Sequence, residues 1–146
     1  MISVSDSNKR ISWDEYFISV AKIISLRSPS MKLRVGSVLV RDKRIVSCGY
    51  NGYPSGLPHE PINVDGHEVN TIHSEVNAIA DSAKRGVSIQ DSVLYVTHFP
   101  CLNCSKSIIA SGIKEIIYLN DYKNDLIATK LLQDANITTK KFSLSE

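Results

Sequence analysis

The sequence predicts an α/β sandwich built on a mixed β-sheet. Two β-branched runs, residues 35–40 and 44–50, are separated by three residues, which is the spacing of a hairpin. After this hairpin, segments with strand character alternate with segments of helical periodicity. Strands that alternate with helices are typical of a layered α/β fold, so we expect helices packed against a sheet.

Composition favours one globular domain. A chain of 146 residues can bury one core, and a hydrophobic fraction of 42% with a charged fraction of 22% is ordinary for a soluble protein. We expect a single domain over residues 13–146, preceded by a loose polar segment at residues 1–12. The net charge of +2 fits a small anionic substrate at least as well as a polynucleotide, and we expect no stable nucleic-acid partner.

The sequence also favours a cytoplasmic location without membrane contact. No apolar run approaches the roughly 20 residues of a membrane span. Residues 1–10 lack the apolar core of a signal peptide. Two of the three cysteines form a CxxC pair, which suits a metal in a reducing compartment better than a disulfide framework.

The individual elements follow from caps, breakers and periodicity. Ser12 and Glu15 form a capping-box pattern, and apolar residues then recur at helical spacing to about Leu26. A polar loop follows the hairpin up to about residue 69, and a loop of this length in a small domain is more often functional than idle. The remaining helices are expected at 73–84, 101–111 and 125–133, and the remaining strands at 92–97, 115–119 and 138–142.

Two short motifs carry the functional prediction, His73-Ser74-Glu75 and Pro100-Cys101-Leu102-Asn103-Cys104. One histidine and two cysteines can hold zinc in three positions and leave the fourth open, whereas structural zinc is closed by four protein ligands. A glutamate two residues from the histidine is placed to move protons on and off a water molecule at the open position. These motifs therefore favour catalysis over scaffolding.

Both motifs lie where a loop or strand becomes a helix. Cys101 and Cys104 share one side of a first helical turn, and His73 and Glu75 lie on the opening turn of another helix. The positive ends of the two helices would favour thiolate over thiol. Such a site attacks an electron-poor carbon that bears an amino group, so hydrolytic deamination is the favoured reaction.

Other interpretations of the same residues stay open. The Cys101/Cys104 pair is also the arrangement of a redox dithiol. His98 is the nearest fourth ligand for a structural zinc in an interaction module, and is otherwise expected to face solvent or a subunit contact. A base deaminase acting on RNA or single-stranded DNA is a further alternative. Cys48 is expected to be a small buried hydrophobe, and Trp13 a packing residue.

Longer stretches around the motifs resemble a known family. They are Leu26–Ser28, Val35–Gly36, Gly49–Gly56, Thr71–Ala78, Tyr95–Cys101 and Ser111–Lys114. From about Trp13 to Leu132 the chain resembles the deoxycytidylate deaminases of the cytidine/deoxycytidylate deaminase superfamily, whose signature is H-x-E with P-C-x-x-C. The resemblance implies a three-layer α/β/α sandwich with a central mixed five-stranded sheet, the cytidine deaminase-like fold.

The resemblance also implies the reaction and its metal. It implies a dCMP deaminase, a hydrolase that acts on a cyclic amidine C–N bond, forms dUMP and feeds thymidylate synthesis, with dCTP as an alternative substrate. His73, Cys101 and Cys104 would hold one catalytic Zn²⁺ per subunit, and Glu75 would be the proton shuttle.

The substrate contacts are implied in the same way. Asn51 would hydrogen-bond the deoxyribose or the base, and the backbone around Ser74 would read the base carbonyl. Val35 and Phe99 would pack against the pyrimidine ring. A guanidinium fork suits phosphate oxygens. The candidates for phosphate contacts are Arg27 and Tyr122.

Family members commonly form hexamers that dCTP activates with Mg²⁺ and dTTP inhibits, so the resemblance implies the same assembly and effectors here. The loop that contains Gly52 and Pro54 is implicated in this control. The chain departs from the family pattern in three places, of which one is Val76, where a polar or other residue often sits. Position 74 is Ser where Ala is usual, and residues 56–70 lack the cysteine with which some members bind a second, structural zinc.

Overall fold

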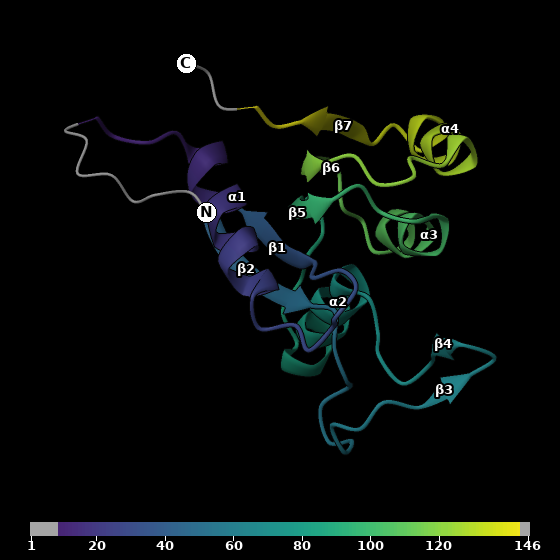
Figure 1. Ribbon diagram of the computed structural model, residues 1–146. Helices are drawn as coiled ribbons and strands as arrows, with labels where there is room; N and C mark the ends of the chain where they lie inside the picture. Colours follow the sequence, from purple (N-terminus) through teal and green to yellow (C-terminus); the bar gives the residue numbers. More distant parts are fainter. Residues whose placement is uncertain (1–8, 144–146) are drawn as a thin grey trace.

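The structure is a computed structural model that describes residues 9–143 (Figure 1). In chain order the elements are α1 (Trp13–Ser25), β1 (Gly36–Arg41), β2 (Arg44–Tyr50), β3 (Asn63–Val64), β4 (His67–Glu68), α2 (Ser74–Arg85), β5 (Val93–His98), α3 (Leu102–Ala110), β6 (Glu115–Asn120), α4 (Leu126–Asp134) and β7 (Thr138–Lys141). Most of the segment predicted to be loose, residues 1–12, lies outside the described range. Within that range every helix is too short or too polar to traverse a lipid bilayer.

The five longer strands form one mixed sheet in the order β2-β1-β5-β6-β7. β1 is antiparallel to both β2 and β5, whereas β5, β6 and β7 run parallel to one another. Parallel neighbours need crossover connections, which α3 supplies between β5 and β6 and α4 supplies between β6 and β7. The predicted hairpin, mixed sheet and C-terminal edge strand are confirmed.

Helices cover both faces of the sheet because successive strand side chains point to opposite sides. On one face, Phe17 of α1 packs with Val38 and Tyr95. On the other face, Leu39 belongs to a core that the three remaining helices complete with Ala78, Ile108 and Leu132. The sandwich therefore has the expected three layers, with α1 on one side and α2, α3 and α4 on the other (Figure 1).

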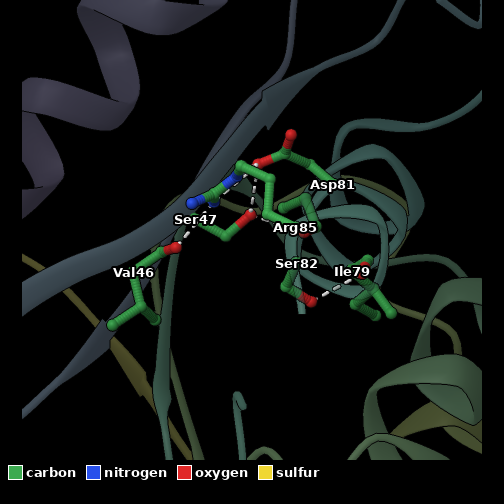
Figure 2. Close-up of polar contacts among 7 residues, drawn as sticks. Val46, Ser47, Ile79, Asp81, Ser82 and Arg85 are labelled. Atoms are coloured by element: carbon green, nitrogen blue, oxygen red, sulfur yellow. Dashed lines mark hydrogen bonds and ion pairs between the residues drawn. The ribbon is translucent and has the colours of Figure 1, made fainter. Parts of the chain in front are cut away.

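Polar contacts attach α2 to the edge strand β2 (Figure 2). Arg85 Nη2 donates to the Val46 carbonyl at 2.8 Å and to Asp81 Oδ2 at 2.7 Å. The Ser47 hydroxyl donates to the Ala78 carbonyl at 2.6 Å. These bonds fix the C-terminal half of α2 against the strand, and the helix axis then directs its N-terminus toward the carboxyl end of β5.

The long loop contains a short hairpin that the sequence analysis did not predict. β3 and β4 pair around Asp65 and Gly66, which have φ values of 49° and 80°. An Asp-Gly pair is the usual signal for a two-residue turn of this kind, so the signal was present in the sequence. Glu68 then organises the loop, since its carboxylate accepts from the amides of Ile62 (3.1 Å), Asn70 (2.9 Å) and Thr71 (3.0 Å).

Burial corrects the prediction for Cys48, whereas the packing predicted for Trp13 is confirmed. Cys48 is exposed, because the neighbouring positions on β2, Ser47 and Gly49, are the ones that face α2. Trp13 packs with one ring face on Phe17 at a centroid distance of 5.7 Å but remains 46% exposed. Neither residue contributes to the site described next.

Candidate active site

The first motif lies at the N-terminus of α2. His73 is the N-cap residue, with extended backbone and no side-chain cap, so its imidazole is free to point away from the helix. Close packing of α2 on β2 depends on Gly49, because a Cβ there would lie 2.7 Å from both the Ala78 nitrogen and the Ser74 oxygen. The absence of a side chain at position 49 therefore sets how near His73 and Glu75 come to the sheet.

The second motif lies at the N-terminus of α3, directly after β5. Cys101 is the N-cap residue, and its sulfur accepts from the Cys104 amide at 3.4 Å. Asn120 holds the end of β5 in place, because its side chain donates to the Thr97 carbonyl at 2.9 Å and its carbonyl accepts from the Phe99 amide at 3.0 Å. Parallel pairing of β5 with β6 thus positions the cysteine-bearing turn.

The two helix N-termini bring three metal-binding side chains together. His73 Nδ1 lies 3.3 Å from Cys104 Sγ and 3.5 Å from Cys101 Sγ. Two ligands of one tetrahedral zinc ion, at roughly 2.1 Å for nitrogen and 2.3 Å for sulfur, lie about 3.6 Å apart. All three ligand atoms are within 4.8 Å of one another, and they form the one such cluster in the described part of the chain. The donor set therefore fits zinc with a fourth position open.

The electrostatics favour the metal-binding form of Cys101. Hydrogen bonds from the Cys104 thiol and from His73 lower the pKa of Cys101 to about 4. The same contact with Cys101 raises the pKa of His73. The contact with Cys101 and burial raise the pKa of Cys104, so of the two sulfur ligands it is Cys101 that is already held as thiolate, the form of cysteine that binds a metal.

Glu75 lies beside the cluster and is 4% exposed. Burial raises the pKa of its carboxyl above the usual 4.5, against the opposing effect of hydrogen bonds from Cys104 and Ser74. The Ser74 hydroxyl donates to Glu75 Oε1 at 2.8 Å. A carboxyl with a raised pKa takes up a proton more readily than an exposed one, which suits a group that accepts a proton and then releases it.

A cavity of about 210 Å³ opens above this cluster. It is lined by Ser30, Lys32, Leu33, Val35, Asn51, His73, Ser74, Glu75, His98, Phe99, Pro100, Cys101 and Tyr122. The structure thus brings five predicted substrate contacts (Val35, Asn51, Ser74, Phe99 and Tyr122) to the metal cluster. Arg27 is exposed just beyond the end of α1 and is not among the lining residues, and neither are Gly52 and Pro54.

Most of the hydrogen-bonding capacity of the Asn51 side chain is used by backbone groups of the cavity wall. Its Oδ1 accepts from the Val35 amide at 2.8 Å, and its Nδ2 donates to the Leu33 carbonyl at 2.8 Å. One N–H of the amide remains for a ligand. Asn51 therefore shapes the wall as well as offering a single contact to substrate.

His98 lines the cavity, which the sequence analysis did not anticipate. The buried Thr97 hydroxyl accepts from the Gly36 amide at 3.1 Å and lies 2.9 Å from His98 Nδ1. If the Thr97 hydroxyl donates to Nδ1, the ring proton lies on Nε2, which is then the donor available to a ligand. Burial lowers the pKa of His98, so the ring is neutral and offers an N–H donor. The sequence signal that could have placed His98 in the cavity was its position just before Pro100 and Cys101.

The chain matches one family model and is similar to several known proteins. The family model described as "Cytidine and deoxycytidylate deaminase zinc-binding region" matches residues 11–120. ComE operon protein 2 of Bacillus subtilis (strain 168) is 42% identical over 142 residues, which cover 94% of this chain and 75% of that protein. Deoxycytidylate deaminase of Homo sapiens is 32% identical over 154 residues, covering 97% of this chain and 85% of the human protein.

Solved structures show the same architecture. The dCMP deaminase from the cyanophage S-TIM5, in complex with dCMP and dUMP, has a TM-score of 0.82 and 31% sequence identity to this chain. The likeness covers 92% of this chain and 99% of the cyanophage chain. The cytidine deaminase-like fold is therefore confirmed.

Proposed function

This chain belongs to the cytidine and deoxycytidylate deaminase family, and we propose that it hydrolyses dCMP to dUMP and ammonia with the help of zinc. The observation that carries the proposal is the His73, Cys101 and Cys104 cluster beside buried Glu75, at the base of a cavity. The substrate is supported by the cyanophage enzyme, whose structure holds dCMP and dUMP.

The residues divide the chemistry between them. His73, Cys101 and Cys104 would hold zinc, which when bound supplies a Lewis acid that makes water nucleophilic near neutral pH. Glu75 takes a proton from the attacking water and delivers protons to the ring nitrogen N3 and to the leaving amine. Water adds to C4 of the base, the C4–N bond breaks, and ammonia leaves, so one water molecule is consumed for each ammonia formed.

The rest of the lining can bind the nucleotide around the reacting carbon. Val35 and Phe99 supply apolar surface for the pyrimidine ring. Asn51 has one N–H donor left for the sugar, the base carbonyl or the phosphate, and His98 offers a second when its ring proton lies on Nε2. Among the described residues that line the cavity, Lys32 carries a fixed positive charge, so the phosphate is expected to lie toward it.

Nucleotide regulation is part of the proposal. Gly52 and Ile72 exchange two backbone hydrogen bonds, at 3.1 and 2.8 Å, so the Gly52–Pro54 loop is tied to the residue immediately before His73. An effector such as dCTP or dTTP that moved this loop would act on the metal ligand directly. A homohexameric assembly and a requirement for Mg²⁺ with the effector remain predictions.

The test is ammonia release by the zinc-loaded protein from dCMP, dCTP, deoxycytidine and a cytosine-containing single strand, each with and without dTTP. Turnover of dCMP that dTTP suppresses is the expected result. Turnover of dCTP would mean that the cavity accepts a triphosphate. Activity on the strand alone would replace the nucleotide proposal with a nucleic-acid base deaminase.

A further inference from the structure

Three buried side chains form a continuous line of hydrogen bonds behind the cavity. Ser37 on β1 lies 2.7 Å, oxygen to oxygen, from Ser74 at the start of α2. The Ser74 hydroxyl lies 2.8 Å from Glu75 Oε1. Ser37 and Ser74 are both 0% exposed and Glu75 is 4% exposed, so water does not compete for these bonds.

The direction of each bond follows from proton counting. A hydroxyl has one proton to donate, and the Glu75 carboxylate can only accept. The Ser74 hydroxyl therefore donates to Glu75 Oε1, and the Ser37 hydroxyl donates to the oxygen of Ser74. Donation by Ser37 polarises the Ser74 hydroxyl and strengthens its bond to the carboxylate.

We propose that Ser37 and Ser74 are positioning residues that hold the Glu75 carboxylate in one orientation. With Oε1 fixed by Ser74, the other oxygen, Oε2, is left to exchange protons in the cavity. The terminal torsion of a glutamate is broad and roughly two-fold, so a fixed donor is needed to select one orientation. This inference rests on the proposed function, because it assigns Glu75 the proton transfers of the deamination.

The device depends on this chain's own residue at position 74. Alanine at this position would have no hydroxyl and could not donate to Glu75. Alanine would also leave Ser37 buried without an acceptor, and a buried unpaired hydroxyl is costly. The two serines therefore act as a pair, one on the strand and one on the helix.

The experiment compares Ser74→Ala, Ser37→Ala and the double variant, all zinc-loaded, in steady-state kinetics and thermal unfolding. We expect Ser74→Ala to lower kcat roughly tenfold while KM stays within about twofold, because the lost bond reaches a charged group. Its Tm should fall by roughly 3 °C or more, since the Ser37 hydroxyl loses its partner. In the double variant Tm should recover in part while kcat stays low.

Ser82→Ala is the matched control. Ser82 is a buried serine of the same helix, 3% exposed, and its hydroxyl donates to the Ile79 carbonyl at 2.6 Å, away from Glu75 (Figure 2). Its kcat and KM should remain at the wild-type values. Zinc content measured for every variant separates positioning of Glu75 from loss of metal.

Each outcome decides the matter. A double variant whose Tm recovers in part while its kcat stays low supports the positioning role. Unchanged kcat in Ser74→Ala, or a kcat that recovers together with Tm, overturns this inference alone and leaves the deaminase intact. Failure of the zinc-loaded wild type to release ammonia from any nucleotide overturns the proposed function, and the positioning role with it.

Discussion

At the scale of single residues, burial decides what Glu75 can do. An exposed glutamate would remain ionised at neutral pH, but Glu75 is 4% exposed and desolvation raises its pKa. The hydrogen bonds from Cys104 and Ser74 oppose this rise and keep the carboxylate accessible. The balance suits a group that must accept a proton and then release it within one turnover.

Replacing Glu75 with Gln should keep the shape of the site and remove the proton transfer. We expect kcat with dCMP to fall by roughly 10²–10⁴-fold. Zinc content should be unchanged, because the three ligand side chains are untouched. Glu60→Gln, on the exposed loop, is the control. An active Glu75→Gln variant with full zinc content would rule out the proposed proton shuttle.

His98 offers a second test at this scale, because its ring lines the cavity with Nδ1 held 2.9 Å from the Thr97 hydroxyl. His98→Leu should raise KM for dCMP roughly three- to tenfold with a smaller effect on kcat, as expected for the loss of one hydrogen bond to bound substrate. His98→Gln, which keeps a donor, should recover part of the loss. Equal KM values for dCMP in the wild type and His98→Leu would show that the Nε2–H does not contact the nucleotide.

At the scale of elements, the site is a meeting of two helix N-termini that the sheet holds in place. α2 is attached to β2 by Arg85 and Ser47, and α3 follows directly from β5. The partial positive charges of both helix ends lie near the thiolates and the carboxylate. The edge strand and a central strand thus set the distance between His73 and the two cysteines.

The loop between β2 and α2 is held by one carboxylate, which gives it a pH dependence. Hydrogen bonding, chiefly from the Thr71 hydroxyl, lowers the pKa of Glu68 below its usual 4.5 in the folded loop. A lowered folded-state pKa stabilises the loop above the unfolded value, and this contribution is lost as pH falls through the lowered pKa. We expect amide-exchange protection at Ile62, Asn70 and Thr71 to be full at pH 7 and to weaken as the pH falls through the lowered pKa of Glu68.

Glu68→Gln should weaken the protection of these three amides at pH 7, and the difference from the wild type should disappear as the pH falls through the pKa of Glu68, while the amides of β5 and β6 keep their protection. Glu60→Gln in the same loop again serves as the control, because no side-chain bond from Glu60 organises the turn. Protection that is identical in the wild type and Glu68→Gln would contradict the role of this carboxylate.

At the scale of the whole molecule, the metal cluster lies outside the two hydrophobic cores. The cores lie on opposite faces of the sheet and are formed by aliphatic and aromatic side chains from all four helices of the described range. Zinc would connect α2 to α3 but would replace none of these contacts. The fold should therefore survive without the metal, unlike a small module that folds around its ion.

Removal of zinc by a chelator should abolish ammonia release and lower Tm, because a bound metal stabilises only the folded state. The far-UV circular dichroism at 25 °C should be retained, and added Zn²⁺ should restore activity. Complete unfolding at 25 °C after chelation would instead support the zinc-stabilised interaction module.

The sequence alone predicted the four helices, the five strands of the main sheet and the two motifs of the metal site, because each of these depends on residues close together in the chain. The capping residue Ser12 marks the start of α1, and its hydroxyl accepts from the Glu15 amide at 3.1 Å as expected. The spacings of His73 with Glu75 and of Cys101 with Cys104 follow from single helical turns. Local chemistry of this kind is readable without tertiary structure.

Tertiary structure decided which side chains surround the metal site and how they are employed. Three hydrogen bonds around the site join residues that are far apart in the sequence. The pairs are Asn51 with Val35, Ser74 with Ser37, and Thr97 with Gly36, separated by 16, 37 and 61 positions. No local pattern encodes such pairs, because each depends on the register of β1 against its neighbours and on the seating of α2. His98 enters the cavity and Arg27 stays outside it for the same reason: strand pairing and helix packing, not sequence spacing, direct their side chains.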